Sequence, residues 1–308
     1  YTNLGGSLME EETIEAMAHA AASCVEYEKL RDAVCEKAAE LTGNEAAFVT
    51  TGASAGLELS AAACMSLDSA GNLDMLPETS AFSKNEILVM DGDVLDIIPY
   101  WKLTGLTGAK IIRVKPDVAS IKAAVCERTA ACMLFPASVY ERCILTCEKL
   151  IPVLKEAGVK VIVDAAAQLP PASNLWYYTK TLGADLAIFS GGKHIKGPQS
   201  TGLIVGNKEL IDLCKAAASP NPGLGRAFKT GKEELAGFIT ALELFVTEDE
   251  EARFERQEKQ LLTIARTVSE KAGIDTEMLR QGRLGTYQPL LHLYLPAPLT
   301  ANECNKYT

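Results

Sequence analysis

The chain has 308 residues, of which 48% are hydrophobic and 23% are charged, a composition typical of a globular protein with one large domain and part of a second. Its formal net charge of −10 weighs against nucleic acid as the main partner, because neutralising phosphates requires clustered lysine and arginine. No apolar stretch has the length of a membrane-spanning helix, and the acidic residues 10–12 are unlike a signal peptide, so we expect a cytoplasmic protein without a membrane partner.

The first 67 residues predict two helices, a strand and a third helix. The two helices cover residues 9–22 and 27–41, and Gly43 ends the second. The strand covers residues 46–50, and Thr51, Gly52, Ala53 and Ser54 lead from it into an alanine-rich helix. Small residues at a helix start expose backbone N–H groups, and the helix dipole adds positive potential, so this turn suits a phosphate group. A plain cap before a buried helix is the alternative.

Strands and helices alternate from residue 86 to residue 206. Strands are predicted over 86–91, 110–114, 131–135, 160–164, 184–189 and 202–206, and helices over 93–106, 117–128 and 147–157. Such alternation predicts an α/β fold with a mostly parallel sheet and helices on both faces. Helices over 207–218, 230–245 and 248–271 follow, and residues 287–295 predict one further strand. Nine cysteines without CxxC pairs or suitably spaced histidines predict free thiols and no metal site.

The central motif is the loop over residues 190–202, which joins two of these strands and presents Lys193 after two glycines. Upstream, Asp164 ends a buried type of strand. A lysine and an aspartate at the carboxyl ends of nearby strands are what a pyridoxal phosphate (PLP) enzyme needs, because the amine condenses with the cofactor aldehyde and the carboxylate keeps the ring nitrogen protonated. The alternatives are a glycine-rich hairpin with a solvated lysine, Lys196 as the reactive lysine, and Asp164 as a helix cap.

Five stretches together resemble the selenocysteine-synthase-like branch of the fold-type I PLP enzymes: residues 4–9, 49–56, 163–171, 190–202 and 225–234. Within that branch they are more similar to the D-glucosaminate-6-phosphate ammonia-lyase group than to L-seryl-tRNA selenium transferase. The resemblance implies an aspartate aminotransferase-like fold, with a large PLP-binding domain over residues 1–248. Residues 249–308 are then a linker helix and the start of a small α+β C-terminal domain, which is incomplete in this chain.

The resemblance also implies roles for individual residues. Lys193 and Asp164 are the expected catalytic residues. The expected cofactor-binding residues are Thr51, Gly52, Ala53, Ser54, Asp164, Gln168, Ser190 and Lys193. The expected substrate-binding residues are Gly6, Ser7, Arg226, Lys229 and Lys232. For Gln168 a structural amide is an equal alternative, and the basic cluster could be a solvated helix start that pairs with Glu233 and Glu234. No residue stands out as the one that stacks on the ring, although Tyr100 and Trp101 are candidates.

The implied function is PLP-dependent α,β-elimination of ammonia and water from a phosphorylated amino sugar acid, which gives a 2-keto-3-deoxy acid phosphate. A selenium transferase acting on L-seryl-tRNA(Sec) is one alternative, although the net negative charge of the chain argues against an RNA partner. A PLP lyase or transferase acting on another small amino acid is a second alternative, and a non-catalytic protein of the same fold is a third. The resemblance further implies a homodimer or larger assembly, in which residues 4–9 cross to a neighbouring subunit.

Overall fold

The computed structural model describes residues 2–91, 101–136, 146–282 and 286–295. The chain divides into two compact units, Tyr1–Thr247 and Glu248–Thr308. The division falls one residue before the boundary that the sequence predicts. Each unit is described by itself below.

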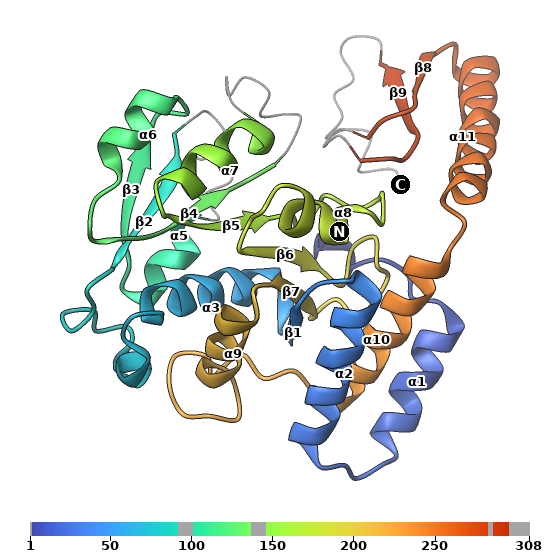
Figure 1. Ribbon diagram of the computed structural model, residues 1–308. Coiled ribbons are helices and arrows are strands. Elements are labelled where there is room, and N and C mark those ends of the chain that lie inside the picture. Colours follow the sequence, from blue (N-terminus) through green and yellow to red (C-terminus); the bar gives the residue numbers. More distant parts are fainter. Residues whose placement is uncertain (1, 92–100, 137–145, 283–285, 296–308) are drawn as a thin grey trace. The chain divides into compact units, whose positions relative to one another are not determined.

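The first unit is built on a seven-stranded sheet (Figure 1). Its strand order is β1-β7-β6-β5-β4-β2-β3. Strand β7 runs antiparallel to both of its neighbours, and the pairs β6–β5, β5–β4, β4–β2 and β2–β3 are parallel. The predicted mostly parallel sheet is therefore confirmed. The strands are β1 (Ala46–Thr50), β2 (Glu86–Met90), β3 (Lys110–Val114), β4 (Thr129–Leu134), β5 (Lys160–Asp164), β6 (Leu186–Ser190) and β7 (Gly202–Gly206).

Helices cover both faces of this sheet, as predicted, because alternate residues of the central strands enter two separate hydrophobic cores. In β6, Ala187 and Phe189 pack on the side of α2, α7 and α10, whereas Ile188 packs on the side of α3 and α9. The helices of this unit are α1 (Glu11–Ala21), α2 (Tyr27–Thr42), α3 (Gly52–Ser66), α5 (Trp101–Thr104), α6 (Val118–Ala124), α7 (Cys147–Glu156), α8 (Asn174–Trp176), α9 (Lys208–Ala217) and α10 (Lys232–Thr247). Shorter turns are η1 (Thr2–Leu4), η2 (Ala70–Met75), η3 (Gly105–Thr107) and the π-helix η5 (Tyr177–Thr181).

Three details differ from the sequence-based expectation. The helix predicted over 117–128 ends at Ala124, because the chain enters β4 at Thr129. The predicted helix over 93–106 lies largely outside the described residues, which contain only α5 and η3 of it. The segment η5 and strand β8 (Asp275–Leu279) were not predicted at all.

The second unit contains one long helix, α11 (Glu250–Ala272), and the antiparallel pair β8 and β9 (Leu290–Tyr294). The Asp249 side chain caps the helix by accepting a hydrogen bond from the Ala252 N–H. Phe254 is fully buried and stacks on the ring of Tyr287, and the Arg280 guanidinium lies 4.5 Å from its ring centroid. These side chains form the packing centre of the unit. None of the described helices of either unit combines the length and the hydropathy that a membrane crossing requires.

Candidate active site

The loop between β6 and β7 is held in a compact shape by its own backbone. The Gly191 N–H donates to the Thr201 carbonyl, and the Gly197 N–H donates to the Gly191 carbonyl, both at 2.9 Å. A Cβ on Gly192 would lie 2.4 Å from the Cα of Gln199, so only glycine allows the two sides of the loop to approach this closely. The close approach fixes the backbone directly before Lys193.

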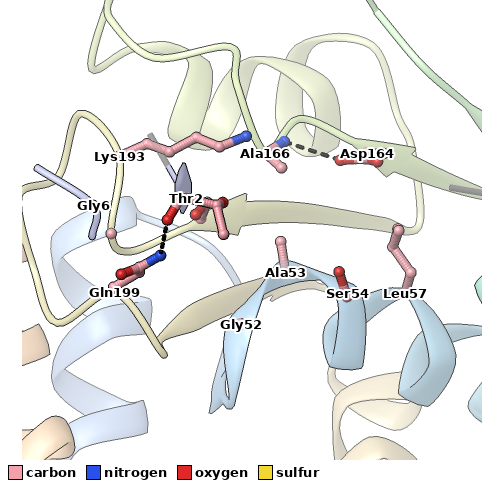
Figure 2. A pocket seen from close by; sticks show the side chains of 12 residues that line it. Thr2, Gly6, Gly52, Ala53, Ser54, Leu57, Asp164, Ala166, Lys193 and Gln199 are labelled. Carbon is pink, nitrogen blue, oxygen red and sulfur yellow. Dashed lines mark hydrogen bonds between the residues drawn. The ribbon is translucent and has the colours of Figure 1, made fainter. Parts of the chain in front are cut away.

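Lys193 and Asp164 reach the same pocket from two different strands. Figure 2 shows the Lys193 side chain extending toward Ala166 and Asp164. The Asp164 Oδ1 accepts a hydrogen bond from the Ala166 N–H at 3.1 Å. Burial raises the pKa of Asp164, although this N–H and the Lys193 ammonium act in the opposite direction. Burial likewise lowers the pKa of Lys193, and Asp164 partly offsets that shift. A larger fraction of Lys193 is therefore the nucleophilic free amine than in an exposed lysine.

The start of α3 forms the side of the pocket that faces Lys193. Gly52 has φ of +78°, and the Thr51 side chain makes no capping hydrogen bond, so the first N–H groups of this 15-residue helix lack a side-chain cap. A Cβ on Gly202 would lie 2.4 Å from the carbonyl carbon of Gly52, so β7 packs backbone against backbone on this helix start. The result is a cradle of backbone amides at the positive end of a helix, which is a recurrent anion site.

The pocket has a volume of about 200 Å³. Figure 2 shows Ala53, Ser54 and Leu57 of α3 across the pocket from Lys193. Both charged side chains in its wall, Lys193 and Asp164, come from the ends of neighbouring strands. Its lining comprises Thr2, Gly6, Gly52, Ala53, Ser54, Leu57, Asp164, Ala166, Ser190, Gly192, Lys193 and Gln199.

Seven of the residues predicted from the sequence line this pocket: Gly6, Gly52, Ala53, Ser54, Asp164, Ser190 and Lys193. Three other residues that were predicted to bind the cofactor or the substrate are not part of the described lining of this pocket: Thr51, Ser7 and Gln168. Thr51 is the residue before α3, and the Ser7 N–H donates to the Gly192 carbonyl at 3.1 Å. Gln168 is buried, and its backbone carbonyl accepts a hydrogen bond from Asn174.

The basic cluster of Arg226, Lys229 and Lys232 does not lie on one helix. Helix α10 begins only at Lys232, because the Glu234 carboxylate caps the Gly231 N–H at 2.6 Å and so sets the first turn there. Lys232 donates to the carbonyls of Ala20 and Ala21, at the C-terminal end of α1, at 2.7 and 3.3 Å. Lys232 thus docks α1 on α10 and is not among the described lining residues of the pocket, so its role in substrate binding stays a prediction.

The other two members of the cluster, Arg226 and Lys229, are exposed in the loop before α10. Neither belongs to the described lining of the pocket. Of the two ring-stacking candidates, Tyr100 lies outside the described residues. Trp101 is also absent from the described lining, and its ring lies beside Lys102 and Arg113.

Five lining residues were missed by the reading of the sequence: Thr2, Leu57, Ala166, Gly192 and Gln199. Leu57 follows Ala53 and Ser54 by one helical turn, so helical spacing could have found it. Gln199 lies within the lysine loop itself and donates to the Thr2 carbonyl at 3.2 Å. Thr2 carries no local signal, because a long-range contact brings it to the pocket. Among the described residues no group of three or more histidine, cysteine, aspartate or glutamate side chains could hold a metal ion.

Comparison with known proteins places this geometry in a family. The family model described as SelA, L-seryl-tRNA selenium transferase, matches residues 132–282. A 5'-C-glycyluridine monooxygenase-decarboxylase from Streptomyces sp is 31% identical over 281 residues, which are 89% of this chain and 68% of the relative. The D-glucosaminate-6-phosphate ammonia lyase of Salmonella typhimurium is 32% identical over 249 residues, which are 79% of this chain and 64% of the relative. The chain belongs to the selenocysteine-synthase-like family of PLP enzymes.

Solved structures agree with this assignment. A structure of D-glucosaminate-6-phosphate ammonia-lyase superposes with a TM-score of 0.79 at 27% identity, covering 95% of this chain and 78% of that chain. A structure titled as SPT with PLP superposes with a TM-score of 0.57 at 14% identity, covering 97% and 83%, and shares the fold alone. The fold is therefore that of the fold-type I PLP enzymes, the family's cofactor is PLP, and the predicted resemblance is confirmed. The chain spans about two thirds of the length of the two curated relatives.

The residues of the pocket fit that cofactor. The uncapped start of α3, with Gly52 and Gly202 in backbone contact, offers N–H donors to a phosphate group. Ser54 and Ser190 add hydroxyl donors at the pocket wall. Lys193 supplies an amine and Asp164 a carboxylate, the two side chains that PLP chemistry requires.

Proposed function

We propose that this chain catalyses the elimination of ammonia and water from a phosphorylated amino sugar acid of the D-glucosaminate-6-phosphate type. The observation that carries the proposal is the meeting of Lys193, Asp164 and the start of α3 in one pocket, in a chain that is 32% identical to an ammonia lyase. Water leaves in the elimination, and one water is consumed when the nitrogen is released by hydrolysis, so the net products are ammonia and a 2-keto-3-deoxy acid phosphate.

PLP, when bound, supplies an aldehyde that links to amines and a ring that accepts electrons from the carbon beside the linked nitrogen. Lys193 is proposed to hold the cofactor before the substrate arrives and to take the proton from that carbon afterwards. The lowered pKa of its buried amine supports the second role, because a base must be unprotonated to accept a proton.

Asp164 is proposed to hold a proton at the pyridine nitrogen. Its position at the end of β5, beside the β6 strand that leads to Lys193, supports this role. Although burial alone raises its pKa, a protonated ring nitrogen in contact would favour the carboxylate form, as any nearby cation does. The Ala166 N–H holds the carboxylate in place. Ser54, Ser190 and the first turn of α3 are proposed to bind the cofactor phosphate.

Arg226 and Lys229 are proposed to bind the phosphate of the substrate, since a planar guanidinium suits a phosphate group. Neither residue lines the described pocket of its own chain, and we propose that they act on the site of a neighbouring copy. A homodimer or larger assembly is proposed accordingly. The exposed side chains of Leu4 and Leu8, 87% and 92% accessible in the segment that carries the pocket residues Thr2 and Gly6, support it.

The test is ammonia release from 2-amino-2-deoxygluconate 6-phosphate by the purified protein supplied with PLP. Lys193→Ala should abolish release together with the borohydride-reducible link to PLP. Lys196→Ala is the matched control, because Lys196 pairs with Glu10 and is not among the described lining residues. Loss of the link in the Lys196 variant and its retention in the Lys193 variant would contradict the assignment.

The phosphate role is tested separately with the unphosphorylated substrate. The phosphorylated form should be preferred in kcat/KM, and Arg226→Ala should reduce that preference about ten- to a hundred-fold, because one charge-assisted hydrogen bond is worth about 1.5–3 kcal/mol. An equal penalty on both substrates would remove Arg226 from phosphate recognition.

A second function is favoured by one specific observation. The relative matched over the longest stretch of this chain among those named above is a monooxygenase-decarboxylase, at 31% identity over 281 residues. Oxygen consumption and carbon dioxide release with an amino acid substrate would identify that activity, whereas elimination releases ammonia without consuming oxygen. A selenium transferase would instead require seryl-tRNA, so activity on a small substrate alone separates it from both.

A further inference from the structure

Helix α3 contains a carboxyl group that the proposed mechanism does not use. Glu58 is only 7% exposed, in a helix where every residue from Ala55 to Ser66 is buried. Its side chain forms no hydrogen bond or ion pair with any described residue. A buried carboxylate without a partner is costly, because its charge loses hydration and gains nothing in return.

The position of Glu58 connects it to the pocket. It directly follows Leu57 and lies one helical turn after Ser54, and both of these residues line the pocket. Side chains on a helix lean toward its N-terminus, so the Glu58 side chain extends over the turn that contains Ser54. Four residues of helix span about 6 Å along the axis. Helix geometry therefore places Glu58 on the same face of α3 as Ser54, about one turn from the N–H groups at the start of the helix.

No charged group on the described elements packed against α3 shifts the pKa of Glu58. The only cause of the shift of the Glu58 pKa, which is raised to about 7, is burial. None of the groups on the packed elements contributes to it. Cys64, on α3 itself, and Cys132 and Cys214, on β4 and α9, have pKa values raised by burial and are neutral thiols. The charged residues on the elements that pack against α3 are Asp74, Lys102, Lys160, Asp164, Lys208, Glu209, Asp212 and Lys215.

We propose that the Glu58 carboxyl must carry a proton when the cofactor phosphate binds at the start of α3, so that binding of the anion takes up a proton. The inference rests on the proposed function. Its physical basis is repulsion between two like charges in a region with little water to screen them. The helix dipole stabilises a negative charge only near the first turn of a helix. Glu58 is the seventh residue of α3 and lies beyond that turn, so it lacks this stabilisation.

The experiment is equilibrium binding of PLP to the full chain at pH 6 and pH 8, for the parent and for Glu58→Gln. With a pKa of about 7, the protonated fraction of Glu58 falls from about nine-tenths at pH 6 to about one-tenth at pH 8. The parent should therefore lose roughly tenfold more affinity over this interval than the glutamine variant. Titration of PLP itself and of Lys193 cancels in this comparison, because both proteins share them.

Glu36→Gln is the matched control, because Glu36 is exposed on α2 and should leave the pH dependence of the parent unchanged. Calorimetry in two buffers of different ionisation enthalpy should show proton uptake in the parent at pH 7 that exceeds the uptake in the Gln variant. If Glu58→Gln does not fold, Glu58→Met removes the charge and keeps the length of the side chain. Equal pH dependence in parent and variant overturns the inference alone, whereas a parent that binds no PLP at either pH overturns the proposed function with it.

Discussion

The titration of Glu58 predicts how the stability of the PLP-free protein depends on pH. Burial raises its pKa from 4.5 to about 7 in the folded chain. The folded state therefore keeps a proton that the unfolded state has lost, and the free energy of unfolding falls as pH rises from about 4.5 to about 7. This difference in pKa corresponds to about 3 kcal/mol at most, because water screens part of the charge, and the larger part of it falls between pH 5 and pH 8. Glu58→Gln lacks this titration, so its stability relative to the parent should rise by that amount across the interval.

Urea unfolding followed by tryptophan fluorescence measures this difference. Both tryptophans of the chain, Trp101 and Trp176, belong to the unit that contains α3, so the signal reports on that unit. Glu36→Gln, which removes one carboxyl group from an exposed position on α2, controls for the loss of an acidic side chain. A stability difference between Glu58→Gln and the parent that does not change with pH would show that the reasoning about the burial of Glu58 is wrong.

Three further predictions concern the pocket and its support. Gly202→Ala places a Cβ 2.4 Å from the backbone of Gly52 and should cost about 3 kcal/mol in thermal unfolding and weaken PLP binding. Gly56→Ala meets side chains rather than backbone, those of Ile188, Ile204 and Thr50 at 3.0, 3.4 and 3.5 Å, and should cost less; equal costs would contradict the close-approach argument. Asp164→Asn should reduce turnover far more than PLP affinity, and near-normal turnover would remove Asp164 from the mechanism. Lys232→Ala should lower stability by about 1 kcal/mol without changing the preference for a phosphorylated substrate; a changed preference would return Lys232 to the substrate site.

The sequence by itself determined those strands and helix ends that depend on neighbouring residues. The apolar run before Asp164 forms β5 over the predicted residues, and β1, β3 and β7 likewise match their predicted bounds. Gly43 ends α2 in the left-handed conformation, as a terminal glycine predicts. These outcomes depend on hydrophobic periodicity and backbone preference, which are properties of neighbouring residues. The family resemblance was read from motifs and is confirmed by the comparisons.

Only the tertiary structure decided what depends on contacts between distant segments. The antiparallel insertion of β7 between β1 and β6 sets the cradle of Gly52 against Gly202, and no local pattern encodes strand order. The resemblance implied one substrate-binding role for Arg226, Lys229 and Lys232, yet Lys232 donates hydrogen bonds to carbonyls of α1 that lie more than 200 residues away in the sequence. The sequence shows Glu58 within an alanine-rich run but does not show that it is buried. Its burial follows from the packing of α3 between the sheet and α9. Burial and partner choice are set by the whole fold, because each depends on which surfaces the other elements cover.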